Sequence, residues 1–386
     1  MGAGLDSLGM LERLVGFDTT SARSNLPLIR FVQDHLAGLG VESRIVPDPG
    51  GEKAALHAVV GPRVAGGVAL SAHTDCVPVE GQAWRADPFR LRREGGRLVG
   101  RGAVDMKGFI ASALAAMPHF QAAGLRRPVH LCLSFDEETT FAGAPLLVAA
   151  LGEDGPPPAL CIVGEPTEMA PVIGHKGYAS WNVEVTGLTG HSSLTHRTAN
   201  ALQAAAEAVA WLAAEARRLA AEGRRAEGFE PPWTTVHVGT FQAGTILNIV
   251  PDLARFVFEV RTVPGDEAEE VLARLRAWLA QAMEPALRAV APEAGFRFER
   301  RCHAPALSLP DGHVLAGMTR RLTGHNGAAR VPYGTEAGVF QQAGIPAIVC
   351  GPGDVAQAHQ PEEWIAEAEI AACDRFMHRL AAELAA

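Results

Sequence analysis

The chain has 386 residues, of which 48% are hydrophobic and 20% charged, a composition typical of globular proteins long enough for two domains. A formal net charge of −9 argues against nucleic acid or an acidic membrane as the main partner. We find neither a signal peptide nor an apolar run of the roughly 18 to 20 residues that a membrane span needs, so we expect a soluble protein. Six cysteines without a CxxC pair are typical of buried free thiols and predict a reducing, cytoplasmic location.

Helical and strand-like segments alternate from the N-terminus onward. Apolar residues at helical spacing predict helices at 5–16, 27–39 and 109–120. A hairpin is expected around Gly95 and Gly96. Short apolar or β-branched runs predict strands at 41–46, 55–60, 68–73, 128–135, 159–163 and 347–350. This alternation predicts an α/β fold with a central mixed sheet flanked by helices.

The pattern changes between residues 178 and 304. The predicted order is strand, long helix, two strands, helix and strand, which is the βαββαβ order of a ferredoxin-like module. These elements are expected at 178–186, 199–222, 234–241, 253–262, 266–286 and 296–303. The sequence therefore predicts a catalytic domain of residues 1–176 and 305–386, into which a lid or dimerisation domain of residues 177–304 is inserted.

Acidic or histidine side chains follow strand-like runs at five places. Because ligands bind at the carboxyl edge of open α/β sheets, one edge could collect them all. They are His73, Asp105, the pair Glu137 and Glu138, Glu165, and His359. Chance explains one or two such placements, but not five.

His73 and Asp75 lie two residues apart on an extended segment, so their side chains point the same way. They suit a metal ligand and the carboxylate that orients it, although a core histidine beside a turn aspartate is an equally open alternative. Two histidines with four or five carboxylates suit one or two divalent cations of the zinc type in an open, hydrolytic site. Asp105 is the natural bridge between two ions. Of Glu137 and Glu138, one can bind metal while the other acts as general base; the alternative is a solvated acidic loop.

Four motifs resemble the dinuclear zinc metallohydrolases, the family that includes acetylornithine deacetylase, succinyl-diaminopimelate desuccinylase, aminoacylase and carboxypeptidase G2. They are Ser-Ala-His-Thr-Asp-Cys-Val-Pro (71–78), Gly-Arg-Gly-Ala-Val-Asp-Met-Lys-Gly (100–108), Asp-Glu-Glu (136–138) and Gly-Glu-Pro-Thr (164–167). The resemblance implies two divalent ions, most often Zn²⁺ with Co²⁺ or Mn²⁺ as substitutes. It implies one site formed by His73, Asp105 and Glu165, and another formed by Asp105, Glu138 and His359. Glu137 would be the general base, Asp75 would orient His73, and a cis peptide would follow Asp105.

Within this family, the segments 175–177, 333–340 and 351–364 resemble the acetylornithine deacetylases. The δ-ammonium group of acetylornithine as substrate requires an acidic or carbonyl-lined pocket, and Glu336, which follows Thr335 in Gly-Thr-Glu-Ala, is a candidate for lining it; both residues are predicted to bind substrate. The loop Gly-Leu-Thr-Gly-His-Ser-Ser (187–193) resembles the family loop whose histidine, here His191, reaches the site of the neighbouring subunit in a homodimer and stabilises the oxyanion. Asn248 and Arg261 resemble substrate-binding positions, and an arginine suits a substrate α-carboxylate. From the residues alone, His191 is a glycine-flanked loop histidine and Arg261 is the end of an edge strand.

The predicted reaction is metal-dependent hydrolysis of the amide of an N-acyl amino acid, most simply N-acetyl-L-ornithine to L-ornithine and acetate in arginine biosynthesis. The alternatives in the same class are another N-acyl-amino-acid deacylase, a succinyl-diaminopimelate desuccinylase or a dipeptidase. The alternative in another class is a non-catalytic protein that binds metal or an amino acid. Glu137 argues against this last alternative, because a binding protein has no use for a general base.

Overall fold

The computed structural model describes residues 5–153 and 155–386, and its internal contacts divide the chain into two compact units. Unit 1 contains Met1–Gly174, Leu307–Arg330 and Thr335–Ala386, and unit 2 contains His175–Ala306 and Val331–Gly334. The predicted domain boundaries followed residues 176 and 304, whereas the observed ones follow 174 and 306. The short return of the chain to unit 2 at 331–334 was not predicted.

Unit 1 is built on a nine-stranded mixed sheet in the order β1-β2-β6-β3-β7-β17-β8-β15, with β16 paired to β8. Its central strands β6, β3, β7 and β17 are parallel, while β1 and β2 at one edge are antiparallel. The strands are β1 (Ser43–Pro47), β2 (Ala54–Val60), β3 (Val68–His73), β6 (Val129–Ser134), β7 (Leu160–Pro166), β8 (Val172–His175), β15 (Leu307–Ser308), β16 (Ala329–Val331) and β17 (Ala347–Gly351). Every residue of β3, β6 and β17 is buried, which explains why these runs carry apolar residues on both faces.

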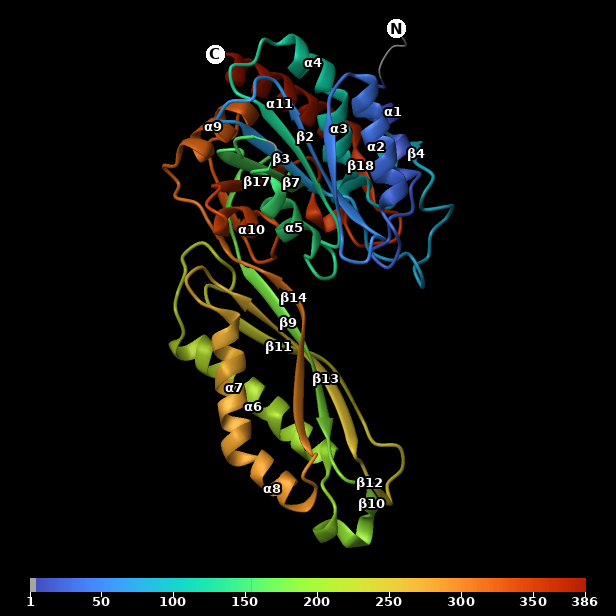
Figure 1. Ribbon diagram of the computed structural model, residues 1–386, viewed down its shortest axis with the longest axis vertical. Helices are drawn as coiled ribbons and strands as arrows, with labels where there is room; N and C mark the ends of the chain where they lie inside the picture. Colours follow the sequence, from blue (N-terminus) through green and yellow to red (C-terminus); the bar gives the residue numbers. More distant parts are fainter. Residues whose placement is uncertain (1–4, 154) are drawn as a thin grey trace. The chain divides into compact units, whose positions relative to one another are not determined.

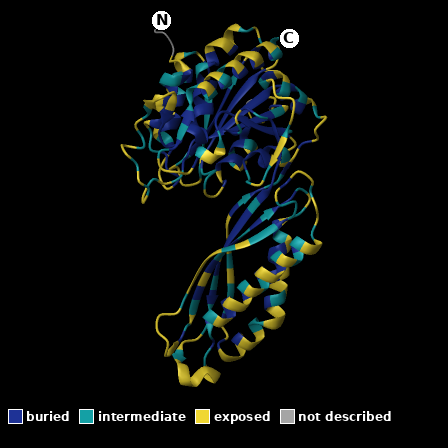
Figure 2. Ribbon diagram, turned by 180° about the vertical axis from the view of Figure 1, so that it is seen from behind, coloured by how far each residue is buried: buried dark blue, intermediate teal, exposed yellow. Residues whose placement is uncertain are grey.

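Helices cover this sheet (Figure 1). They are α1 (Ser7–Val15), α2 (Leu26–Gly38), α3 (Gly108–Ala115), α4 (Met117–Ala122), α5 (Gly143–Ala150), α9 (Val314–Thr323), α10 (Ala337–Gln342) and α11 (Glu367–Ala385). Helix α3 packs on β3 and β7 and contacts α1 and α11, whereas α5 packs on β2 and β6 and contacts α10. Figure 2 shows the resulting core as a block of buried strands beneath helices whose outer faces are exposed.

The structure adds detail to three predicted segments. The hairpin of β4 (Arg92–Glu94) and β5 (Arg97–Val99) turns at Gly95 and Gly96, whose φ values of 57° and 80° are those of a type I′ turn. It forms a small sheet with β18 (Trp364–Ala366). The predicted helices at 109–120 and 266–286 are each divided in two, because a proline lies in the first turn of the second half.

Unit 2 has the predicted βαββαβ order. Its main sheet, in the order β11-β13-β9-β14, is antiparallel throughout. The elements are β9 (Gly177–Thr186), α6 (Ala201–Glu222), β11 (Thr235–Ala243), β13 (Leu253–Thr262), α7 (Ala268–Ala282), α8 (Glu284–Val290) and β14 (Gly295–Ala304). A separate pair of short strands, β10 (Gly190–His191) and β12 (Ile249–Val250), lies at one end of the unit (Figure 1). Within the described residues, no helix is both long enough and apolar enough to cross a membrane.

Candidate metal centre and catalytic site

The polar side chains predicted to gather at one sheet edge do so, and all of them belong to unit 1. His73 is the last residue of β3, and Glu165 lies near the end of the neighbouring β7. Glu137 and Glu138 follow β6, and His359 follows the short 3₁₀ turn Val355–Gln357 beyond β17. Since β3, β6, β7 and β17 are parallel, their carboxyl ends deliver these side chains to the same place.

Asp105 lies between the two histidines. One carboxylate oxygen, Oδ1, is 2.9 Å from Nε2 of His73, and the other, Oδ2, is 3.3 Å from Nε2 of His359. His359 also contacts Glu138 at 3.0 Å, and His73 lies 3.6 Å from Glu165. This arrangement places Asp105 where a carboxylate that bridges two cations would lie. The Asp105–Met106 peptide bond is cis, as the family resemblance implies.

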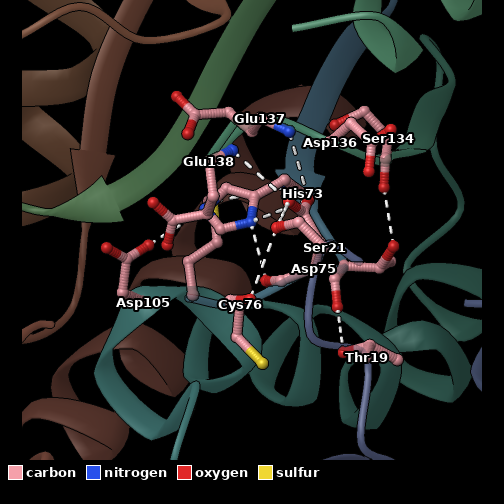
Figure 3. A network of polar contacts seen from close by, with 12 residues as sticks. Thr19, Ser21, His73, Asp75, Cys76, Asp105, Ser134, Asp136, Glu137 and Glu138 are labelled. Atoms are coloured by element: carbon pink, nitrogen blue, oxygen red, sulfur yellow. Dashed lines mark hydrogen bonds and ion pairs between the residues drawn. The ribbon is translucent and has the colours of Figure 1, made fainter. Parts of the chain in front are cut away.

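Asp75 organises the site through backbone as well as side-chain contacts (Figure 3). The carbonyl oxygen of Asp75 accepts a hydrogen bond from Nδ1 of His73 at 3.0 Å, which leaves Nε2 facing the other ligands. Its carboxylate accepts hydrogen bonds from the backbone N–H groups of Glu137 (3.2 Å) and Glu138 (3.3 Å) and from the hydroxyl of Ser21 (2.7 Å). Burial by itself raises the pKa of Asp75, but the contact with His73 and these hydrogen bonds hold it below the usual value. Asp75 therefore fixes both the histidine and the glutamate pair.

The two glutamates reach different neighbours. Asp136, the first residue of the acidic triplet, pairs with Lys53 instead of entering the site. A carboxylate oxygen of Glu137 lies within 4.8 Å of ligand atoms of His73 and Glu165, and one of Glu138 lies equally close to ligand atoms of His73 and Asp105. By distance alone, Glu137 is thus as well placed to bind a cation as to act as a base.

The carboxylates crowd one another in a way that fits a cation. Burial, followed by the charge of Glu165, raises the pKa of Glu137 well above its usual value, and burial followed by Asp105 raises that of Glu138 to about 7. The same two causes, burial and Asp105, raise the pKa of Glu165. Oxygen Oε1 of Glu165 is buried without a hydrogen-bond partner among the described residues. Imidazole and carboxylate donors with an orphaned buried oxygen are what a pair of divalent cations would satisfy, so the residues fit the implied metals.

A chain of hydrogen bonds that was not predicted from the sequence joins two of these ligands, and it runs from the buried Glu363 and Arg101 to the surface at Gln82. Glu363 accepts hydrogen bonds from the backbone N–H of Asp105 (3.3 Å) and from Nη1 of Arg101 (2.6 Å). Arg101 also donates to Oε1 of Gln82, whose Nε2 donates to the carbonyl of His359 at 3.1 Å. Asp105 and His359 are therefore tied together through their backbones. The only signal in the sequence was the Glu-Glu pair shortly after His359.

We expect Arg101→Met to lower the free energy of unfolding by about 3 to 5 kcal/mol, because it leaves Glu363 as an unpaired buried charge. Arg101 and Glu363 are 0% and 1% exposed. The measurement is urea unfolding of the full-length protein. Arg93→Met is the control, since Arg93 forms an ion pair with Glu367 at the surface and its removal should change stability little. Equal effects of the two substitutions would contradict a structural role for the buried pair.

Thr335 and Glu336, predicted to bind substrate, are both buried. Thr335 is 1% exposed, and its hydroxyl accepts a hydrogen bond from the backbone N–H of Ala337 in the first turn of α10. Glu336 is 0% exposed, and both of its carboxylate oxygens accept hydrogen bonds from buried serines, Ser71 and Ser134. Both oxygens of Glu336 are used in internal hydrogen bonds, which gives no support to its predicted contact with substrate, and the predicted role of Thr335 stays a prediction.

The remaining candidates lie in unit 2. His191 is exposed and ends β10, opposite Ile249 of β12, and the carbonyl of Asn248 accepts a hydrogen bond from Ser192. His191 and Asn248 are therefore neighbours. Arg261 lies eight residues beyond the start of β13 at Leu253, roughly 26 Å away at about 3.3 Å per residue. It contacts Glu259 at 2.9 Å and stacks over the ring of Tyr178. Unit 2 thus holds its predicted functional residues at opposite ends of β13.

A two-unit α/β fold that gathers histidines and carboxylates at the carboxyl edge of the parallel strands of a mixed sheet is that of a metal-dependent amidohydrolase, and comparison with known proteins supports this class. Residues 69–383 match the model of Peptidase family M20/M25/M40, and the chain belongs to this family. It is 37% identical over 384 residues to an acetylornithine deacetylase of Myxococcus xanthus, covering 96% of each chain. It is 33% identical over 349 residues to an acetylornithine deacetylase of Photorhabdus laumondii, covering 90% of this chain and 88% of the relative.

Solved structures share the fold at low sequence identity. An M20 family metallo-carboxypeptidase from Sulfolobus solfataricus superposes with a TM-score of 0.76 at 17% identity, covering 99% of both chains. A dinuclear metal-binding peptidase of the M20 family from Bacillus subtilis gives a TM-score of 0.65 at 17% identity, covering 98% of this chain and 97% of that one. At this identity the similarity establishes the fold alone.

Proposed function

We propose that this enzyme hydrolyses the amide bond of N-acetyl-L-ornithine to give L-ornithine and acetate, a step of arginine biosynthesis. The observation that carries the proposal is the 37% identity to an acetylornithine deacetylase along almost the full length of both chains. All five proposed metal ligands belong to unit 1, and a carboxylate oxygen of Glu137 lies within 4.8 Å of ligand atoms of His73 and Glu165. We further propose a cytoplasmic location, supported by six cysteines that are all free and buried.

His73, Asp105 and Glu165 are the proposed ligands of one cation, and Asp105, Glu138 and His359 are those of the other. Zinc is the proposed metal, because imidazole and carboxylate ligands suit it, with cobalt and manganese as substitutes. When bound, the cations supply Lewis-acid polarisation of the amide carbonyl and lower the pKa of water in the site. Asp105 would be a ligand common to both cations, and Asp75 keeps His73 and the glutamate pair in place.

Glu137 is the proposed general base. Its carboxylate takes a proton from the attacking water and then delivers a proton to the nitrogen of the leaving amine. The carboxylate of Asp75 accepts a hydrogen bond from the backbone N–H of Glu137 and so fixes the loop that carries both glutamates. On this loop the side chain of Glu137 lies near Glu165, and that of Glu138 lies near Asp105. One residue of the pair can thereby bind metal while the other moves the proton.

Rates on a panel of acylated amino acids test the substrate. We expect kcat/KM to be highest for N-acetylornithine and lower for N-acetylcitrulline, N-acetylmethionine and N-succinyl-diaminopimelate. A clear preference for one of the other compounds would assign the enzyme to another N-acyl-amino-acid deacylase or to a desuccinylase. Activity on dipeptides but not on acetylated amino acids would make it a dipeptidase.

We also propose a homodimer in which His191 stabilises the oxyanion at the partner's site and Arg261 binds the substrate α-carboxylate at its own. The roughly 26 Å of β13 between the two ends of unit 2 supports this division. That length exceeds an extended N-acetylated amino acid, so a single substrate cannot contact both residues of one unit. A two-fold axis would give each site a histidine from the other subunit.

Mixed dimers test this proposal. We expect His191→Ala and Glu137→Ala to be nearly inactive separately. After the two variants are unfolded and refolded together, random assortment makes half of the dimers mixed, and each mixed dimer has one site with both residues. About a quarter of the wild-type activity should therefore return. If mixed dimers form but remain inactive, His191 does not act across the subunits.

A further inference from the structure

Glu336 is a buried carboxylate behind the metal centre. It immediately precedes α10 and is 0% exposed. Its Oε1 accepts a hydrogen bond from the hydroxyl of Ser71 and its Oε2 from that of Ser134, each at 2.5 Å. Ser71 lies two residues before His73 on β3, and Ser134 is the residue of β6 that pairs with His73. Glu336 therefore lies on the same face of the sheet as the side chain of His73, and Ser71 and Ser134 lie between it and the proposed metal ligands.

Among the described residues, no lysine or arginine side chain forms an ion pair with this carboxylate. Two other buried glutamates do have guanidinium partners: Glu363 pairs with Arg101, and Glu215 pairs with Arg218 and Arg274. Within the part of the chain that the structure describes, the hydrogen bonds to Glu336 come from the two neutral hydroxyls of Ser71 and Ser134. A buried charge with hydrogen bonds but no counter-ion is costly, so its presence calls for a positive charge nearby.

The backbone register shows where that positive charge would lie. Ser71, which donates to Oε1 of Glu336, lies two residues before His73 on β3 and pairs with Val163, two residues before Glu165 on β7. Burial raises the pKa of Glu336, and the hydrogen bonds from Ser134 and Ser71 lower it only in part. Glu336 thus lies behind both proposed ligands of the first ion position.

We propose that Glu336 is a positioning residue of the metal centre, an outer carboxylate whose negative charge strengthens cation binding at His73 and Glu165. Ser71 and Ser134 hold it in place and keep it hydrogen-bonded. This inference rests on the metal dependence of the proposed function and extends it to a residue that binds neither metal nor substrate.

The test is Glu336→Gln. Glutamine has the same shape, and its amide can accept from one serine and donate to the other, because a hydroxyl serves as donor or acceptor. We expect the zinc affinity of the full-length protein, measured by competition with a chromophoric chelator, to fall about tenfold. The melting temperature of the metal-free protein should stay the same or rise, since an unbalanced buried charge has been removed. Unchanged zinc affinity, or a lower melting temperature of the metal-free variant, would overturn the proposal.

Two control variants separate charge from structure. Glu215→Gln removes a buried carboxylate in unit 2, so it should lower the melting temperature and leave zinc affinity unchanged. Ser134→Ala keeps the charge of Glu336 and removes one hydrogen bond, so it should weaken zinc binding less than Glu336→Gln. An equal or larger effect of Ser134→Ala would show that position rather than charge matters, and would overturn the proposal. If wild-type protein binds zinc and hydrolyses N-acetylornithine while Glu336→Gln binds zinc equally well, only this inference fails; if wild-type protein binds no zinc, both fail.

Discussion

Glu137→Ala should lower kcat by a factor of about 10² to 10⁴, the usual contribution of a positioned general base, while the protein keeps its full metal content. Glu137, the proposed base, lies close to His73 and Glu165, on a loop that Asp75 holds by two backbone hydrogen bonds. Steady-state kinetics and metal analysis of the same preparation make the measurement. KM should change little, because the substitution removes a step of the chemistry rather than a substrate contact.

Glu138→Ala is the matched comparison for Glu137→Ala. Glu138 contacts His359 at 3.0 Å, and its carboxylate lies near Asp105, so its loss should release metal. The distances alone place either glutamate near enough to a cation. Loss of metal from Glu137→Ala, with metal retained in Glu138→Ala, would reverse the roles assigned to the two residues.

Removal of metal should abolish activity. Without a cation, the carboxylates at this edge raise one another's pKa, and Oε1 of Glu165 has no hydrogen-bond partner among the described residues, so the site lacks the positive charge that would polarise an amide carbonyl. Dialysis of the full-length enzyme against a chelator should leave it inactive, and zinc or cobalt should restore its rate. Magnesium is the comparison, because it prefers oxygen ligands and its recovery of activity should be poorer. Full activity in protein shown by metal analysis to be metal-free would contradict the dinuclear assignment.

The order and kind of most elements could be predicted because each carries a local signal. The fully buried strands β3, β6 and β17 are apolar runs that stop at polar residues, and the β4–β5 hairpin turns at two glycines with positive φ. Boundaries shifted where proline enters a helical run, as between α3 and α4. Helices α5, α9, α10 and α11 were not predicted, although α9 and α11 have an apolar face toward the core.

The sequence by itself determined which side chains gather at the site, because parallel strands deliver the residues after their carboxyl ends to one edge, and His73, Glu137 and Glu165 follow from that rule. Only the tertiary structure decided how Asp105 is shared between His73 and His359, and that Glu363, Arg101 and Gln82 tie these ligands together. Glu336 was predicted to line a substrate pocket, whereas the tertiary structure shows it buried and hydrogen-bonded to Ser71 and Ser134. The physical reason is that exposure and hydrogen-bond partners depend on contacts between residues far apart in the chain, 265 positions for Ser71 and Glu336, which no local pattern records.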